Sequence, residues 1–280
     1  MPAPMPPTRH LPPTPLGALA CLLAALLLAL AAAPALADWR HNGDGFVALI
    51  ADNGRPVHWE ARLVLVEVSL KGAPPGALEA ARCAFAAWEE ALLKECGVEC
   101  GVECGVPLRF LVEPTEREGS LDHKDGTNFV FWGQCDDIAR TRTYSDQRDP
   151  AAITGFDMVL SRNKPWGLAP DGRVGYDPQS VITHEVGHVL GLADVRPGDV
   201  GPGNGRSAEG AAVAAGCPPQ EGALSGLTMF GWATCGETLK RRLKAGDRRG
   251  VAFLYAGGAR GGGAKPSLAG ARLDSTAAAP

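Results

Sequence analysis

Two histidines and a glutamate stand at the spacing that a metal-binding helix requires. Residues 184–194 read HEVGHVLGLAD, so His184 and His188 lie one helical turn apart and can turn both imidazoles toward one cation. Glu185 follows the first histidine, where its carboxylate can hold a water molecule beside the ion and take its proton. The pattern predicts a metal site whose chemistry is hydrolysis.

A third ligand is predicted a few residues further on. Gly191 is expected to end the helix in a left-handed conformation, and the turn would bring Asp194 back to the metal. Two imidazoles and a carboxylate leave the fourth position of a tetrahedral zinc open, as a catalytic site requires. His123 is the alternative third ligand. A chance motif on a surface helix is the competing interpretation, and Gly191 and Asp194 argue against it.

Two helices are predicted to position this chemistry. Asp177 is a suitable N-cap for the motif helix, and Pro178 suits its first position. Residues 77–94 repeat apolar side chains at helical spacing and predict a long amphipathic helix packed on a sheet. Its apolar stripe consists of Leu78, Ala81, Phe85, Trp88 and Leu92.

Four segments read as strands, which together with the helices predict an α+β fold. Residues 61–70 alternate as a half-buried strand does, with Val64, Val66 and Val68 on one face. Residues 108–113, 128–132 and 152–161 are the other predicted strands. Residues 134–150 are polar, and we expect them to be irregular.

The N-terminal segment predicts export. Residues 16–37 carry no charge and end in Ala-Leu-Ala, which favours a signal peptide over residues 1–37, cut before Asp38. An uncleaved membrane anchor is the alternative. The expected product is secreted or periplasmic, with no stable membrane association after cleavage. Residues 256–280 are rich in Gly and Ala, and we expect a disordered tail.

Charge and cysteine content limit the class of protein further. The 27 Lys and Arg against 31 Asp and Glu give a net charge of −4, which argues against nucleic acid as a partner. Seven of the eight cysteines lie beyond the signal segment, and export favours disulfide bonds. Three of them fall in the repeat ECGVECGVECGV at 95–106. We expect Cys83 to pair with Cys135 or with a cysteine of this repeat.

The extended motif resembles that of a known enzyme family. His184-Glu185-x-x-His188-x-x-Gly191-x-x-Asp194 is similar to the zinc motif of the metzincin metallopeptidases, particularly the secreted bacterial matrixin-like members. The last position is Asp, as in the snapalysin-like group, where most metzincins have His. Residues 225–230, SGLTMF, resemble the methionine turn, with Met229 beneath the metal. Residues 243–255 resemble the last matrixin helix, with Asp247 as its N-cap.

The resemblance implies a catalytic domain over residues 38–255. Its fold would be a twisted five-stranded mixed sheet with two long helices, a zinc cleft and a small C-terminal subdomain at 192–255. The strand at 155–161 would form the edge of the cleft and bind an extended substrate. The loop after Met229, residues 230–233, would form an apolar pocket for the residue that follows the cut. A Cys217–Cys235 disulfide would brace that pocket.

The implied function is that of a secreted zinc endopeptidase. Glu185 would be catalytic, one Zn²⁺ would be bound by His184, His188 and Asp194, and Met229 would support the site. The substrate would be a protein or peptide and the enzyme a monomer, while calcium binding stays open. The alternative is a non-catalytic zinc-binding surface or binding module of the same fold, and the presence of Glu185 favours the enzyme.

Overall fold

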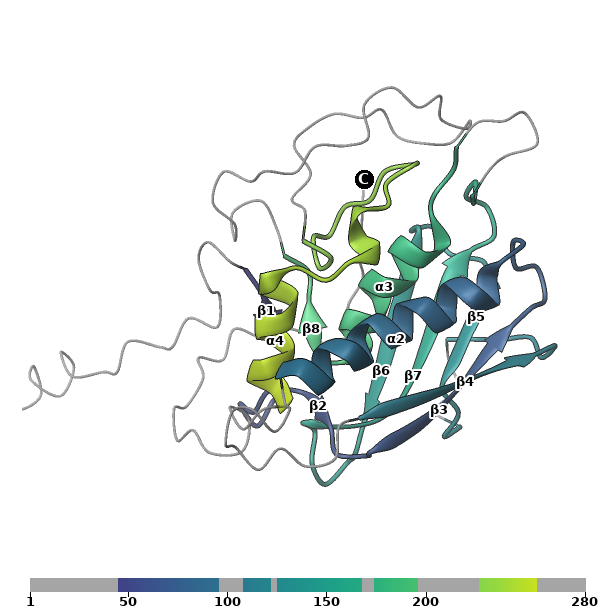
Figure 1. Cartoon of the computed structure of the whole chain (residues 1–280). Helices are drawn as coiled ribbons and strands as arrows, with labels where there is room; N and C mark the ends of the chain where they lie inside the picture. Colours follow the sequence, from purple (N-terminus) through teal and green to yellow (C-terminus); the bar gives the residue numbers. More distant parts are fainter. Residues whose placement is uncertain (1–44, 96–107, 122–124, 168–173, 196–226, 256–280) are drawn as a thin grey trace, which may run out of the picture. The chain divides into compact units, whose positions relative to one another are not determined.

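The computed structural model describes residues 45–95, 108–121, 125–167, 174–195 and 227–255 (Figure 1). All of them belong to one unit of the chain, residues 39–280. The expectations for the signal peptide 1–37, for repeat residues 96–106, for His123 and Cys217, and for the tail 256–280 lie outside these ranges. Within them, no helix is long and apolar enough to cross a bilayer.

The main element is a mixed sheet of six strands, one of which is only two residues long. Its order is β2-β7-β5-β3-β4, with β6 also paired to β7. Neighbouring strands are parallel, except that β6 is antiparallel to β7. The prediction of an α+β fold with a mixed sheet is confirmed. The strands are β2 (His58–Trp59), β3 (Leu63–Ser69), β4 (Arg109–Thr115), β5 (Phe129–Gly133), β6 (Ala139–Ser145) and β7 (Ala152–Ser161).

Strand β3 shows why the predicted strands form. Val64, Val66 and Val68 are buried against the helices, while Leu63 and Leu65 point away and are 64% and 51% exposed. This alternation is the half-buried pattern read from the sequence. Strand β5 is buried throughout and β7 is buried except at Thr154, because both faces of these strands are covered. On the second face Phe129, Phe131 and Val159 form a small cluster.

Strand β6 corrects two expectations. Residues 139–145 pair along their length with β7, so the prediction of an irregular segment at 134–150 is wrong there. The sequence ARTRTYS lacks large aliphatic residues, and its pairing with β7 supplies what its own hydrophobicity does not. The prediction that residues 155–161 form the exposed edge of the cleft is also wrong. Strand β7 is paired with β5 on one side and with β6 on the other.

The predicted helices are present, and two of them lie on the same face of the sheet (Figure 1). These two helices are α2 (Ala77–Glu95) and α3 (Pro178–Val189). The short 3-10 helix η3 (Leu239–Arg241) and helix α4 (Ala245–Tyr255) follow later in the chain. Trp88 of α2 is fully buried, and its indole Nε1 donates to the Thr183 carbonyl of α3 at 2.7 Å. This contact fixes α3 on α2.

Asp247 has a larger role than the N-cap that the sequence predicted. It lies inside the first turn of α4, and its carboxylate accepts the Lys244 N–H at 2.7 Å, which caps the helix from within. The same carboxylate accepts the N–H groups of Thr228 and Met229 at 3.1 and 3.2 Å. Burial raises the pKa of Asp247, and these N–H bonds oppose the shift. Asp247 therefore ties the Met229 segment to α4.

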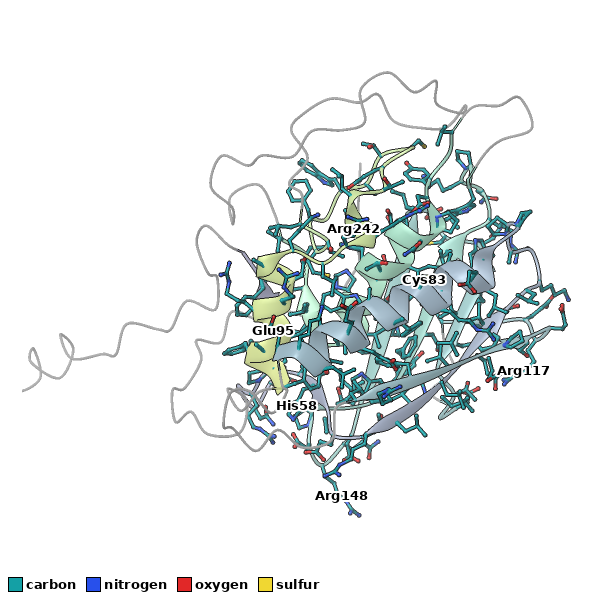
Figure 2. The ribbon with its side chains drawn as sticks, viewed as in Figure 1. His58, Cys83, Glu95, Arg117, Arg148 and Arg242 are labelled. Carbon is teal, nitrogen blue, oxygen red and sulfur yellow. The ribbon has the colours of Figure 1, made fainter. Side chains whose placement is uncertain are left out.

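The described cysteines differ from the expected pairing. Cys83 and Cys135 are both free, so the proposed Cys83–Cys135 bond and any bond from Cys83 to the repeat are wrong. Cys83 lies on α2 (Figure 2), where its thiol donates to Glu79 Oε1 at 3.5 Å. Cys135 packs instead beside the small cluster of Phe129, Phe131 and Val159. Cys235 is disulfide-bonded, and its partner lies outside the described residues.

Replacing Trp88 tests the contact between the two long helices. Trp88→Ala is expected to reduce the free energy of unfolding by about 3–5 kcal/mol, because it leaves a cavity and removes the donor to Thr183. Leu93→Ala on the same helix is the control, since Leu93 is 46% exposed, and it should change that free energy by less than about 0.5 kcal/mol. Urea denaturation measures both, and equal effects would contradict this packing.

Candidate metal centre

Helix α3 carries its motif into the interior of the molecule. Asp177 caps the helix by accepting the Ser180 N–H at 2.7 Å, and Pro178 occupies the first turn, as predicted. Every residue from 180 to 189 is buried. His184, Glu185 and His188 are therefore 5%, 2% and 1% exposed. Histidines and a carboxylate at such depth need specific partners.

The end of α3 is built around Gly191. Its φ is +99°, and a Cβ added there would lie 2.1 Å from the Val57 carbonyl oxygen, so only glycine fits. Immediately afterwards β8 (Leu192–Ala193) pairs with β1 (Val47–Ala48). The chain thus turns back along α3, and Asp194 reaches the two histidines, as the sequence predicted.

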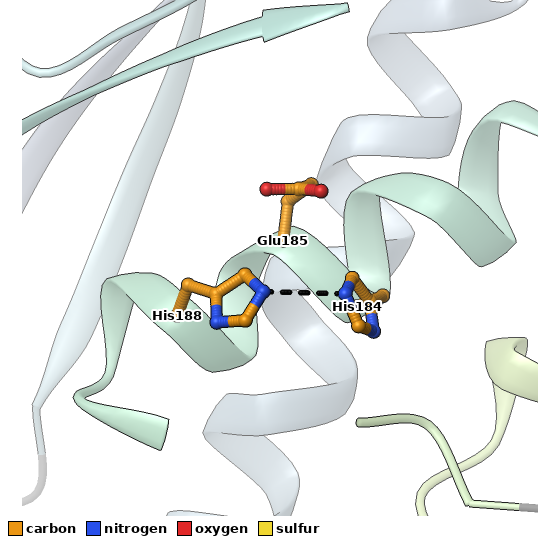
Figure 3. Close-up of side chains that lie close together, drawn as sticks. All are labelled: His184, Glu185 and His188. Carbon is orange, nitrogen blue, oxygen red and sulfur yellow. Dashed lines mark hydrogen bonds between the residues drawn. The ribbon is translucent and has the colours of Figure 1, made fainter. Parts of the chain in front are cut away.

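Three ligand atoms converge at this point. The two Nε2 atoms of His184 and His188 are 3.2 Å apart (Figure 3), and Asp194 Oδ1 lies 3.2 Å from the first and 3.5 Å from the second. Atoms bound at about 2.0–2.1 Å to one tetrahedral ion are about 3.3 Å apart. The three atoms therefore have the separations that one face of such a coordination tetrahedron requires.

The hydrogen bonds at Nδ1 orient both imidazole rings so that their Nε2 lone pairs face the same point. His184 Nδ1 lies 2.7 Å from the Thr228 carbonyl, and His188 Nδ1 lies 2.9 Å from the Leu192 carbonyl. Because a carbonyl can only accept, each Nδ1 carries a proton, and a neutral ring then has a lone pair on Nε2. Asp194 Oδ1 is also buried and accepts no well-aligned hydrogen bond from the described residues. Three lone pairs that face one another fit a cation.

Electrostatics agree with this arrangement. Burial opposes a charge on His188, but the close carboxylate of Asp194 outweighs burial and raises the pKa of His188 to about 9. The two histidines likewise hold the pKa of Asp194 below its usual range, although burial acts to raise it. The site therefore favours positive charge strongly enough to retain a proton in its interior.

Glu185 lies beside the three ligand atoms. Its carboxylate oxygen and the two histidine nitrogens lie within 4.8 Å of one another. Asp194 Oδ1 lies at 3.2 and 3.5 Å from the two imidazoles, which makes it the candidate third ligand. Glu185 Oε2 accepts the Thr141 hydroxyl of β6 at 2.6 Å. Thr141 fixes the Glu185 carboxylate, and the polar sequence of β6 gave no indication of this role.

Met229 lies beneath the helix, as predicted. It is fully buried, and a Cβ added to Gly187 of α3 would lie 2.0 Å from its sulfur. The Met229 carbonyl accepts the Val195 N–H at 2.7 Å, next to Asp194. The preceding Thr228 carbonyl holds His184. The Met229 segment therefore positions two of the three ligands, through backbone contacts that the sequence did not reveal.

A pocket opens beside the site. Its walls come from β6, α3 and the chain after Met229. The pocket is mainly aliphatic, as the apolar prediction has it, and Lys240 of η3 adds a polar group to its wall. Of the predicted loop residues 230–233, Gly231 and Ala233 line it, whereas Phe230 and Trp232 do not. The lining residues are Ile138, Ala139, Val181, His184, Glu185, Gly231, Ala233 and Lys240.

Replacing Gly191 tests how the third ligand is positioned. Gly126 also has a positive φ, of +82°, but a Cβ there would meet nothing within 4 Å. Gly126→Ala should therefore cost only the backbone strain of about 1–2 kcal/mol. Gly191→Ala should cost about 1–3 kcal/mol more, because its Cβ collides with Val57. Urea denaturation compares the two, and similar losses would mean that the close approach to Val57 is absent.

Two comparisons with known proteins give no match. No protein-family model matches the chain, and no curated protein matches it. The chemistry of the site therefore has to be argued from its own residues. Those residues are a histidine pair, a third ligand delivered by a glycine turn, and a second carboxylate held by a threonine.

Proposed function

We propose that this protein is a secreted zinc endopeptidase of the metzincin type. The observation that carries the proposal is the convergence of His184 Nε2, His188 Nε2 and Asp194 Oδ1 at 3.2–3.5 Å beside the Glu185 carboxylate. A structural metal site surrounds its ion with four protein ligands, whereas three protein ligands beside a free carboxylate are typical of hydrolytic sites.

The ligand set favours zinc over other divalent ions. Two imidazole nitrogens and one carboxylate oxygen suit Zn²⁺, whereas Ca²⁺ and Mg²⁺ require six or more oxygen ligands. The separations of the ligand atoms fit a tetrahedral ion of short bond length. Backbone carbonyls of Thr228 and Leu192 fix both ring orientations, as the outer partners of zinc-binding histidines usually do.

The bound ion, Glu185 and Thr141 would have different roles in hydrolysis. Bound zinc supplies a Lewis acid that polarises a peptide carbonyl and acidifies a water molecule. Glu185 Oε2 is held by Thr141, so the other oxygen, Oε1, is the atom that accepts the proton from the water. Oε1 then returns the proton to the departing amine nitrogen. Burial of Glu185 keeps competing water away from this transfer.

A carboxylate ligand at Asp194 makes proton transfer depend more on the other groups of the site. A carboxylate neutralises more of the charge of the ion than a third imidazole does, so activity depends more on the surrounding partners. Gly231 packs against Asp194, and a Cβ there would lie 3.2 Å from the Asp194 Cγ. A phenol at position 231, which some metzincins direct at the metal, is therefore missing. Glu185 is left as the main group for proton transfer.

Export is part of the proposal. The disulfide at Cys235 suits an oxidising compartment, in agreement with the signal peptide read from residues 1–37. The proposed substrate is an exposed or unfolded segment of protein, cut by a monomeric enzyme.

Removal of the third ligand tests the metal assignment. Asp194→Ala is expected to weaken zinc binding by at least about tenfold, because only two imidazoles are left. Asp149→Ala is the control, since Asp149 pairs with Arg55 and neither residue lines the pocket beside the site. Competition with a fluorescent chelator measures the affinity. Unchanged affinity in Asp194→Ala would assign the third ligand elsewhere, with His123 as the next candidate.

Removal of the proton acceptor tests the catalytic assignment. Glu185→Gln keeps the shape and the hydrogen bond of the side chain but cannot accept the proton, so hydrolysis of denatured casein should fall by at least about 100-fold. Zinc content, measured by atomic absorption, should stay at one ion per chain. The control is Glu90→Gln on the exposed side of α2. Zinc binding without any chelator-sensitive hydrolysis in the unsubstituted protein would favour the non-catalytic zinc-binding module instead.

A further inference from the structure

A lysine is buried in the wall of the pocket beside the metal centre. Lys240 belongs to η3 and is only 2% exposed, although the residues on either side of it, Leu239 and Arg241, are exposed. It lines the same pocket as His184 and Glu185. Lysine is almost never fully buried unless a partner neutralises it.

The partners that the described structure gives Lys240 are few. Its Nζ donates a short hydrogen bond to the Phe230 carbonyl, and no other acceptor among the described residues lies within hydrogen-bonding distance. An ammonium group has three N–H bonds, so two are left for another partner. Each unmet bond in the interior carries a cost of desolvation.

Glu237 is the carboxylate with the largest electrostatic effect on Lys240, but the two side chains form no ion pair within 4.0 Å. Glu237 is 3% exposed, its Oε2 accepts the Thr234 N–H at 3.3 Å, and its Oε1 accepts no hydrogen bond from the described residues. Burial raises the pKa of Glu237, which weakens its negative charge. Burial lowers the pKa of Lys240, and the carboxylates of Glu237, Asp194, Glu185 and Asp247 oppose that shift.

The rest of the pocket supplies shape rather than charge. Ile138, Ala139, Val181 and Ala233 are aliphatic, and Gly231 adds no side chain. These walls exclude water from a bound side chain, which strengthens any charge interaction inside the pocket. Lys240 is the one lysine or arginine among the lining residues.

We propose that Lys240 makes this pocket selective for an acidic side chain, Asp or Glu, at the substrate residue that follows the cut. This inference rests on the proposed peptidase function and names its substrate class. A substrate carboxylate would accept the N–H bonds of Lys240 that the Phe230 carbonyl leaves unmet. An aliphatic side chain would leave these N–H bonds unmet, and the corresponding amide would accept them without the added attraction of a negative charge.

Matched peptides test the inference. The substrates are identical peptides with Asp, Asn, Glu, Gln or Leu after the cut. The unsubstituted, zinc-loaded protein should cleave each acidic peptide with a kcat/KM at least about tenfold higher than that of its amide. Lys240→Met keeps the length of the side chain without its charge, and the ratio of acid to amide should fall to about one while the Leu peptide is still cleaved.

A control separates local contact from general attraction. Arg242→Met removes an exposed positive charge two residues away, on a surface that does not line this pocket. It should leave the ratio of acid to amide unchanged. An equal fall in Arg242→Met and Lys240→Met would assign the preference to long-range electrostatics and overturn the inference.

The outcomes also separate this inference from the proposed function. Cleavage without preference for the acid in the unsubstituted protein would overturn the inference and leave the peptidase assignment intact. An acidic preference that persists in Lys240→Met would overturn it as well, and would leave Lys240 as a structural contact to Phe230. Failure to cleave any of the peptides, with zinc bound, would count against the peptidase itself. If Lys240→Met does not fold, the ratio of kcat/KM for the acidic and amide peptides in the unsubstituted protein still tests the predicted acidic preference.

Discussion

The structure depends on holding three lone-pair donors together in a buried space. His184 Nε2, His188 Nε2 and Asp194 Oδ1 lie 3.2–3.5 Å from one another with little access to water. Such groups repel one another unless a cation or a proton lies between them. The nearby carboxylate of Asp194 raises the pKa of His188, in the direction expected of a site that attracts positive charge. A bound ion satisfies all three atoms at once, whereas a proton satisfies only two.

Most contacts around the site serve to keep these atoms from separating. The Thr228 and Leu192 carbonyls orient the rings, and the Val195 N–H ties the Asp194 segment to Met229. The buried carboxylate of Asp247 in turn holds the N–H groups of Thr228 and Met229. Segments far apart in the sequence therefore form one network of hydrogen bonds, and the ligand geometry is set before any ion arrives.

The sequence predicted the features that local interactions decide. Helix α3 has its cap, its first-turn proline and its terminal glycine within the chain segment itself, and α2 and β3 show their periodicities openly. Strand β6 was missed because its pairing with β7 outweighs its polar composition. The free thiols of Cys83 and Cys135, the grip of Thr141 on Glu185 and the burial of Lys240 also depend on contacts between distant segments, which composition and spacing do not encode.

The burial of Lys240 is hard to explain as a structural device alone. A neutral donor of similar length would bond the Phe230 carbonyl equally well, without the cost of several kcal/mol that accompanies a buried ion. Folded chains retain such costs mainly where a charge has a function. Lys240 lines the same pocket as Glu185. The proposed recognition of an acidic substrate gives this charge a role that the contact to the Phe230 carbonyl does not require.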